Sequence, residues 1–185
     1  MQDILIVDNF DSFTYNLAHY FEGLGCHVDV VRKNDLDIDI TKYDRIVISP
    51  GPGLPDDSQV HDLITRTDNK TPILGVCLGM QGIAQYLKGR LVNKSSVKHG
   101  VEDIITVDTS SPLFENCDSI MTVGLYHSWE VTDEGDYCID AVSNSDGAIM
   151  AISNIEERMY GVQFHPESIL TQEGRQVLDN FLKNG

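Results

Sequence analysis

The first half of the chain alternates short apolar runs with helical patterns, and this alternation limits the possible folds more than any other feature. Four runs are short, rich in β-branched residues and bounded by turn residues, as strands of a buried sheet are. They cover residues 4–7, 27–31, 45–49 and 73–76. Because strands that alternate with helices form right-handed βαβ units, the pattern predicts an α/β fold with an open, mostly parallel sheet flanked by helices on both faces.

Helical spacing fills the intervals between these strands. A first helix is predicted to begin at an N-cap supplied by Asp11 or Ser12, because a short polar side chain there accepts hydrogen bonds from free backbone N–H groups. Gly23 and Gly25 are expected to end this helix, since glycine tolerates the left-handed conformation found at helix C-termini. Further helices are predicted over residues 57–67 and 78–87.

After Gly89 the pattern changes to closely spaced short strands. We expect these strands to add antiparallel members to the sheet, at residues 100–107, 120–125, 137–143, 148–153 and 159–164. A last helix is predicted over residues 174–183. No repeat, low-complexity segment or linker interrupts the sequence, so residues 1–185 are expected to form a single domain.

The composition of the 185 residues, 41% apolar and 23% charged, is typical of soluble globular proteins. The longest aliphatic run, Ile4 to Val7, is far too short to cross a bilayer. Acidic residues outnumber basic ones by 29 to 13, and the net charge of −16 disfavours binding to nucleic-acid phosphates. We therefore expect a cytoplasmic protein with no nucleic-acid or membrane partner.

Four cysteines stand at positions 26, 77, 117 and 138. None belongs to a Cys-x-x-Cys pair or to a cysteine and histidine spacing typical of zinc sites, so we expect neither a disulfide framework nor a metal site. Cys26, Cys117 and Cys138 are predicted to be small buried apolar residues. Cys77 stands in a different local sequence.

Cys77 lies within Gly75-Val76-Cys77-Leu78-Gly79, directly after a predicted strand and before a predicted helix. This is the pattern of a nucleophile elbow, with cysteine in the place of serine. The start of the following helix would stabilise a thiolate and direct backbone N–H groups at an oxyanion forming beside the sulfur. A buried cysteine packed between two glycines explains the pentapeptide equally well.

Two further segments end predicted strands at the same edge of the sheet. His165 follows a strand, and Pro166 turns the chain so that Glu167 can orient the imidazole, as in a nucleophile–base–acid triad. Pro50-Gly51-Pro52-Gly53 follows another strand and can bring a backbone N–H close to a ligand. Each segment alone is also explained by an ordinary turn. Together they stand where open α/β sheets place their sites, at the carboxyl ends of the strands.

These segments resemble those of the class I glutamine amidotransferases, and the resemblance runs along the whole chain. Five segments carry it: Asp8-Asn9-Phe10-Asp11-Ser12-Phe13-Thr14-Tyr15-Asn16-Leu17, Ser49-Pro50-Gly51-Pro52-Gly53, Gly75-Val76-Cys77-Leu78-Gly79-Met80-Gln81, Tyr126-His127-Ser128 and Gln163-Phe164-His165-Pro166-Glu167-Ser168-Ile169-Leu170-Thr171. The first and last of them resemble the branch that serves chorismate-using synthases. Within this branch we expect the glutaminase subunit of anthranilate synthase, in tryptophan biosynthesis, with that of aminodeoxychorismate synthase, in folate biosynthesis, as the alternative.

The resemblance implies that Cys77, His165 and Glu167 hydrolyse the side-chain amide of glutamine and that the ammonia passes to a chorismate-using large subunit. It also implies an oxyanion hole made of the backbone N–H groups of Gly53 and Leu78. It assigns glutamine binding to six residues, Gly51, Pro52, Gly53, Gln81, Ser128 and Trp129. No cofactor is implied for this subunit, whereas the large subunit is expected to need magnesium.

The sequence departs from the family pattern in two places, at Trp129 and over residues 54–59. Trp129 stands where leucine is common, which is tolerable if this position binds through its backbone but alters specificity if its side chain packs on the substrate. Residues 54–59 read Leu-Pro-Asp-Asp-Ser-Gln instead of Thr-Pro-x-x-Ala-Gly, so the loop beside the oxyanion hole is expected to differ.

Other functions fit the sequence less well. A receiver domain needs a phosphorylatable aspartate at the end of a later strand, where this chain has Ser49 and Cys77. A dinucleotide site needs a third glycine after Gly51-Pro52-Gly53 at the required spacing. A cysteine peptidase or related hydrolase shares the elbow and the histidine, and it is the main alternative to an amidotransferase.

Overall fold

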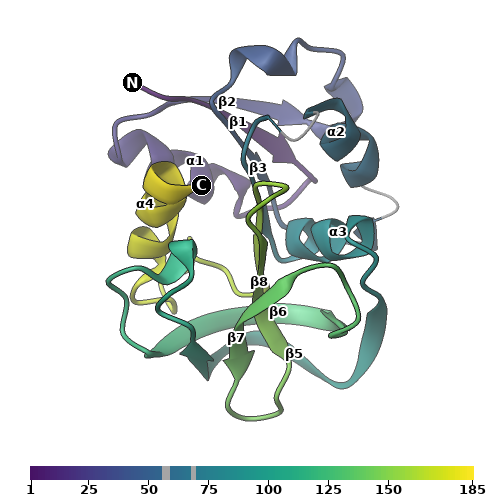
Figure 1. Ribbon diagram of the computed structural model, residues 1–185, viewed down its shortest axis with the longest axis vertical. Coiled ribbons are helices and arrows are strands. Elements are labelled where there is room, and N and C mark those ends of the chain that lie inside the picture. The colour runs from purple at the N-terminus through teal and green to yellow at the C-terminus, as the bar shows by residue number, and fades with distance from the viewer. Residues whose placement is uncertain (56–58, 68–69) are drawn as a thin grey trace.

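The computed structural model describes residues 1–55, 59–67 and 70–185. Within them, nine strands form one mixed sheet in the order β2-β1-β3-β4-β9-β8-β7-β5-β6 (Figure 1). The strands are β1 (Asp3–Asp8), β2 (His27–Arg32), β3 (Arg45–Ile48), β4 (Ile73–Val76), β5 (Leu91–Val107), β6 (Ile120–Val131), β7 (Cys138–Ser143), β8 (Ile149–Asn154) and β9 (Met159–Val162). The α-helices are α1 (Thr14–Gly23), α2 (Val60–Thr67), α3 (Leu78–Tyr86) and α4 (Gly174–Asn184).

The parallel half of the sheet contains β2, β1, β3, β4 and β9. Strand β9 comes from late in the chain but pairs with β4, with Val76 opposite Val162 at the carboxyl ends of the two strands. As a result, the segments that follow β1, β3, β4 and β9 all emerge at one edge. The predicted α/β fold is confirmed, and the segments at this edge contain six of the predicted site residues, Gly51, Pro52, Gly53, Cys77, His165 and Glu167.

The antiparallel half is made of β8, β7, β5 and β6. Strand β5 starts at Leu91, well before the expected residue 100, and pairs with β6 over nearly its whole length. The first part of β5 was not predicted from the sequence because it is polar. Its pairing with β6 is also irregular, with register shifts between Asn93 and Lys98 and between His99 and Val101.

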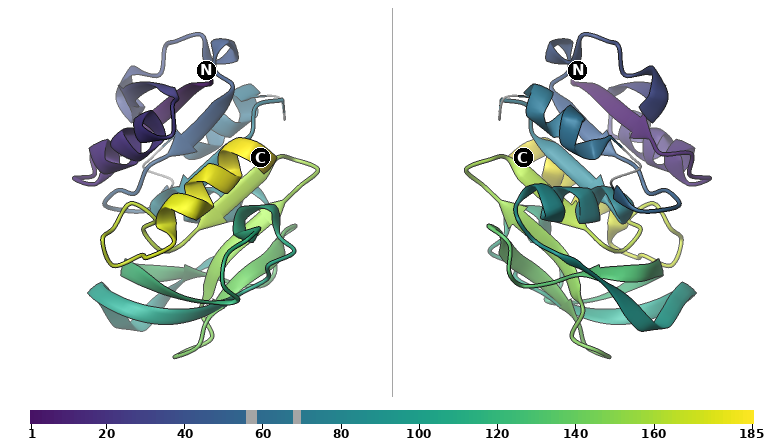
Figure 2. Two further views of the ribbon diagram at one scale, coloured as in Figure 1. Left: turned by 90° about the vertical axis from the view of Figure 1, so that its left-hand side faces the viewer. Right: turned by 90° about the vertical axis from the view of Figure 1, so that its right-hand side faces the viewer.

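Helices cover both faces of the sheet, as the views from two sides show (Figure 2). On one face, α1 and α4 contribute Leu17, Phe21, Leu178 and Phe181 to a buried apolar cluster. On the other face, α2 and α3 contribute Leu63, Ile64, Ile83 and Ala84 to a second cluster. The two clusters explain why the strands between them are apolar without alternation.

The start of α1 differs from the prediction. Its N-cap position is Phe13, which makes no side-chain capping bond. Asp8 organises the preceding turn instead, since its Oδ1 accepts hydrogen bonds from the N–H groups of Phe10 and Asp11 and from the Thr14 hydroxyl. The Oδ1 atom of Asp11 accepts a hydrogen bond from the N–H of Phe13, so this side chain also stabilises the turn before the helix and does not cap α1. The predicted helix end is confirmed, with Gly25 at φ +88°.

The four cysteines are all free, in differing surroundings. Cys117 is buried as expected, and burial raises the pKa of its thiol to about 11. Cys26 is half-buried, and Cys138 is exposed, so the prediction of burial is wrong for Cys138. The reason is that the first residues of β7 face outward. Across the described residues, no group of three His, Cys, Asp or Glu side chains is placed to hold a metal ion.

The remaining helices agree closely with the prediction. Helix α3 spans Leu78–Tyr86, and α4 spans Gly174–Asn184. Helix α2 begins at Val60, and the predicted start at residue 57 lies outside the described residues. Of the helices in the described parts of the chain, none has the length and apolar character that a membrane crossing requires.

Candidate active site

Cys77 stands on the tight turn between β4 and α3, with the left-handed backbone value φ 53°. The glycines on either side are required by backbone contacts. A Cβ at Gly75 would lie 2.3 Å from the carbonyl carbon of Gly79, and a Cβ at Gly79 would lie 2.4 Å from the oxygen of Ile48. Such a strained cysteine persists only because the surrounding packing enforces it, as in a nucleophile elbow.

His165 and Glu167 form a buried pair at the end of β9. The Nδ1 atom of His165 lies 2.6 Å from Oε1 of Glu167, and the two residues are only 1% and 3% exposed. The rings of Phe13 and Tyr126 contact the imidazole edge-on, with centroid distances of 5.5 and 4.7 Å. The ring is therefore held by a carboxylate at one nitrogen and by aromatic contacts at its sides.

The protonation of His165 depends on both of its acidic neighbours. Burial lowers the pKa of His165, but Cys77 and Glu167 favour the imidazolium and raise the pKa to about 10. The backbone brings the two residues to one site, since the N–H of Cys77 donates to the oxygen of Val162, three residues before His165. Apart from its interaction with Cys77, the buried Nε2 atom of His165 has no hydrogen-bond partner among the described residues, so it is available to exchange a proton with a reacting group.

Hydrogen bonds hold the turn after His165 against β6. The N–H of His165 donates to the oxygen of Gly124, and the hydroxyl of Thr171 donates to the oxygen of His165 at 2.6 Å. The N–H of Gly124 in turn donates to the Thr171 hydroxyl at 3.0 Å. These three bonds fix the position from which Glu167 reaches back to the imidazole.

The segment after β3 is held by Asn9. The Asn9 side-chain amide donates to the oxygen of Ser49, and its backbone N–H donates to the Ser49 hydroxyl, both at 2.9 Å. A Cβ at Gly51 would lie 2.5 Å from that of Asn9, so only glycine fits there. Gly53 has φ +85° and is exposed together with Pro52. This contact of Asn9 was not predicted from the sequence.

Leu78 directly follows Cys77 as the first residue of α3. The first N–H groups of a helix have no intrahelical acceptor, so they can donate to an oxyanion beside the sulfur. Gly53, the other predicted oxyanion donor, lies in the segment after β3, the strand that pairs with β4. Residues 54–59, whose sequence departs from the family pattern, lie partly outside the described residues, so the expected difference in this loop stays a prediction.

Gln81 is 4% exposed and takes part in a chain of hydrogen bonds. Its Nε2 atom donates to the backbone oxygen of Trp129 and to Oε1 of Gln163, both at 3.1 Å. The Nε2 atom of Gln163 donates to Sγ of Cys77 at 3.4 Å. Trp129 therefore contacts Gln81 through its backbone oxygen. Ser128 lies beside it on β6, half-buried.

Gln163 is a site residue that was not predicted from the sequence. The sequence offered no specific signal for it, because Gln163 lies just after the end of β9, where the chain bends. Its side chain is fully buried, and its Nε2 atom contacts Sγ of Cys77.

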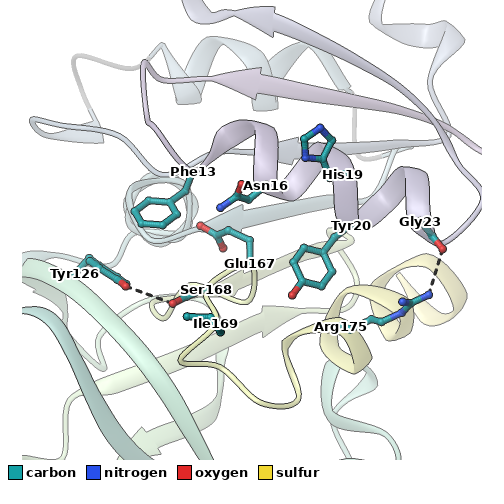
Figure 3. Close-up of a pocket in the computed structure, with 10 residues that line it drawn as sticks. All are labelled: Phe13, Asn16, His19, Tyr20, Gly23, Tyr126, Glu167, Ser168, Ile169 and Arg175. Carbon is teal, nitrogen blue, oxygen red and sulfur yellow. Dashed lines mark hydrogen bonds between the residues drawn. The ribbon is translucent and has the colours of Figure 1, made fainter.

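A cavity of about 570 Å³ lies beside Glu167 (Figure 3). Its lining comes from α1 and the residue before it, from β6, from the turn after His165 and from α4, namely Phe13, Asn16, His19, Tyr20, Gly23, Tyr126, Glu167, Ser168, Ile169 and Arg175. Tyr126 and Ser168 are hydrogen-bonded at 3.3 Å, and Arg175 donates to the oxygen of Gly23. Ile169 is 95% exposed.

Comparison with known proteins identifies the family. The glutamine amidotransferase class-I family matches residues 5–184. Anthranilate synthase component 2 of Lactococcus lactis is 41% identical and aminodeoxychorismate synthase component 2 of Escherichia coli is 44% identical, each over 97% of this chain and 93% or 98% of the relative. A solved structure of a putative GMP synthase protein from Thermoplasma acidophilum superposes with a TM-score of 0.86 at 27% identity, covering 99% of this chain and 93% of that one. The chain therefore belongs to the class I glutamine amidotransferases.

Proposed function

We propose that Cys77, His165 and Glu167 form a catalytic triad that hydrolyses the side-chain amide of glutamine. The observation that carries this proposal is the buried His165–Glu167 pair at 2.6 Å, which follows the strand β9 to which the strained turn of Cys77 is hydrogen-bonded. Nucleophile, base and orienting acid are the three parts that covalent amide hydrolysis needs.

In the proposed reaction the Cys77 thiolate attacks the amide carbon, and the His165 imidazolium protonates the nitrogen, which leaves as ammonia. The product is a γ-glutamyl thioester. Because the sulfur is then uncharged, it no longer favours the imidazolium, and neutral His165 can take a proton from water. The resulting hydroxide attacks the thioester, glutamate leaves, and the thiolate is restored.

The backbone N–H groups of Gly53 and Leu78 are the proposed donors to the oxyanion. Removing one such donor typically costs about 3 to 4 kcal/mol of transition-state stabilisation. Gly51, Pro52, Gly53, Gln81, Ser128 and Trp129 are the proposed glutamine-binding residues. In this arrangement Gln81 and Ser128 supply polar groups for the α-amino and α-carboxyl groups of the substrate.

We further propose that the chain is the glutaminase subunit of an anthranilate synthase and delivers ammonia to a chorismate-using large subunit. Several relatives that match over nearly their whole length are named component 2 of anthranilate synthase, including that of Pseudomonas aeruginosa at 39% identity. Ammonia released into water near neutral pH is protonated and loses its nucleophilicity, so the large subunit should receive it in a closed passage. Any magnesium is assigned to that subunit, no cofactor is proposed for this chain, and the location is cytoplasmic.

The test is ammonia release from glutamine by the wild type and by Cys77→Ser, each with and without a cognate anthranilate synthase large subunit. We expect that this partner activates the wild type and that anthranilate is formed. The variant should be inactive with glutamine but should support synthesis from added ammonia. Activation by an aminodeoxychorismate synthase partner instead would transfer the assignment to that enzyme, which the 44% identical relative makes the second candidate. Silence with both partners would refute the proposed activity.

A further inference from the structure

The proposed mechanism leaves one buried contact of the nucleophile unused. Gln163 is fully buried, and its side-chain nitrogen lies 3.4 Å from Sγ of Cys77. A buried amide is retained only where its hydrogen bonds are satisfied, and both ends of this side chain have partners. Gln163 can therefore hold the Cys77 sulfur in place through this hydrogen bond.

The direction of this contact is fixed by a backbone carbonyl far away in the sequence. The oxygen of Trp129 can only accept, so Gln81 must turn its NH₂ group toward it. The same NH₂ group lies 3.1 Å from Gln163, which must therefore present its oxygen to Gln81. Gln163 is left with its own NH₂ group on the sulfur. The Trp129 carbonyl thus ensures that Cys77 receives a donor.

The same bonds limit what Gln81 can offer to a ligand. One hydrogen of its NH₂ group goes to Trp129 and the other goes to Gln163. Its oxygen is the remaining hydrogen-bonding atom, and an oxygen acceptor suits the α-ammonium group of an amino acid.

We propose that Gln163 is a positioning residue that holds the Cys77 sulfur through an N–H bond, and that Gln81 links this bond to the α-ammonium group of the bound substrate. The link to substrate rests on the proposed glutaminase function, whereas the bond to sulfur does not. An N–H donor favours the thiolate over the thiol, since hydrogen bonds to charged groups are the stronger ones. A substrate that binds the Gln81 oxygen strengthens the chain and keeps the nucleophile aligned.

The test compares Gln163→Met with the matched control Gln85→Met. Gln85 is half-buried one turn further along α3 and is outside this hydrogen-bonded chain. The rate of Cys77 alkylation by iodoacetamide is measured against pH by peptide mass spectrometry, which separates Cys77 from the exposed Cys138. In Gln163→Met the pH of half-maximal rate should rise by about one unit, which is a tenfold smaller thiolate fraction. The control should match the wild type.

Steady-state kinetics with glutamine separate the two parts of the proposal. Gln163→Met should lower kcat about tenfold and leave KM within about twofold. Gln81→Met should raise KM and also lower kcat, because it removes the substrate contact together with the support of Gln163. A change in KM alone for Gln81→Met would refute the link between substrate and sulfur.

An unchanged alkylation profile in folded Gln163→Met would overturn the assignment of Gln163. If that variant fails to fold by circular dichroism, Gln81→Met provides the test, since it should shift the profile in the same direction by a smaller amount. No shift in Gln81→Met would then overturn the proposal. A wild type without glutaminase activity would refute the proposed function, and the alkylation profiles would still decide on the Gln163 contact.

Discussion

The reactivity of the site depends on how a single residue, His165, holds its proton. The imidazole is buried, which by itself favours the neutral ring, yet Cys77 and Glu167 reverse that preference. In the proposed reaction the contribution of Cys77 ends when the thioester forms, while that of Glu167 persists. One histidine can therefore act first as an acid and then as a base without moving.

The pH dependence of turnover provides a test of this balance. The raised pKa keeps His165 protonated through neutral pH and up to about pH 10. The wild type should therefore retain its general acid, and with it its turnover, well above neutral pH. Glu167→Gln removes one of the charges that raise this pKa, and the alkaline limb should therefore move toward lower pH, with kcat reduced by about 10²-fold or more. The measurement is glutamate formation against pH.

Glu173→Gln serves as the matched control, because this half-buried carboxylate accepts a hydrogen bond from the N–H of Asp118 rather than from the histidine. Its profile should follow the wild type. Identical alkaline limbs in Glu167→Gln and the wild type would show that Glu167 does not set the proton affinity of His165.

Single residues differ in how far the sequence could predict their roles. Cys77, His165 and Glu167 could be selected because each stands in a local pattern at a strand end. Gln163 could not be assigned in this way. Its donor role depends on the direction imposed by the Trp129 carbonyl, which only the pairing of distant strands brings near.

Among the elements, the strand–turn–helix unit of β4 and α3 carries Cys77, the proposed nucleophile, and has no room for extra atoms at its glycines. Gly75 contacts Gly79 across the turn, and Gly79 contacts Ile48 on the neighbouring strand β3. The left-handed backbone of Cys77 costs about 1 to 3 kcal/mol, which these contacts must offset.

Gly79→Ala is expected to destabilise the fold by about 1 to 3 kcal/mol, because its Cβ would lie 2.4 Å from the oxygen of Ile48 and would push α3 away from the sheet. Glutaminase activity should fall as well, since α3 starts at the nucleophile. The measurement is urea unfolding together with turnover. Gly23→Ala is the matched control at a helix position where an added Cβ meets no atom within 4 Å, and it should be neutral or slightly stabilising. Equal unfolding midpoints for the two variants would contradict the packing argument.

Elements with strong apolar patterns were predicted well, and polar or irregular ones were not. Strands β1, β3 and β4 are continuous apolar runs, and their bounds agree with the prediction within about a residue. The first half of β5 is polar and pairs irregularly, so no period-two pattern marks it. The helix cap was misassigned because Asp8, at the end of β1, takes over the turn that Asp11 and Ser12 occupy.

At the scale of the whole molecule, several apolar side chains are exposed to solvent around the edge of the sheet that carries the proposed triad. Ile169 in the turn after Glu167 is 95% exposed, Tyr15 on α1 is 61% exposed and Phe10 after β1 is 47% exposed. Ile169 lines the cavity beside Glu167, and the chain as a whole carries a net charge of −16. Exposed apolar groups beside a site mark an interaction surface. This is the surface on which the proposed large subunit would enclose the released ammonia.

Ile169→Glu is therefore expected to weaken the affinity for the large subunit by about tenfold or more, because it places a charge in an apolar contact. Glutaminase turnover of the isolated chain should stay unchanged, since the Ile169 side chain is 95% exposed to solvent. The matched control is Ile155→Glu, at a 51% exposed isoleucine in the turn between β8 and β9, which lies at the opposite edge of the sheet. Titration of each variant against the large subunit, with ammonia transfer and complex formation as readouts, measures the difference. Equal affinities for the two variants would place the docking surface away from the cavity beside Glu167.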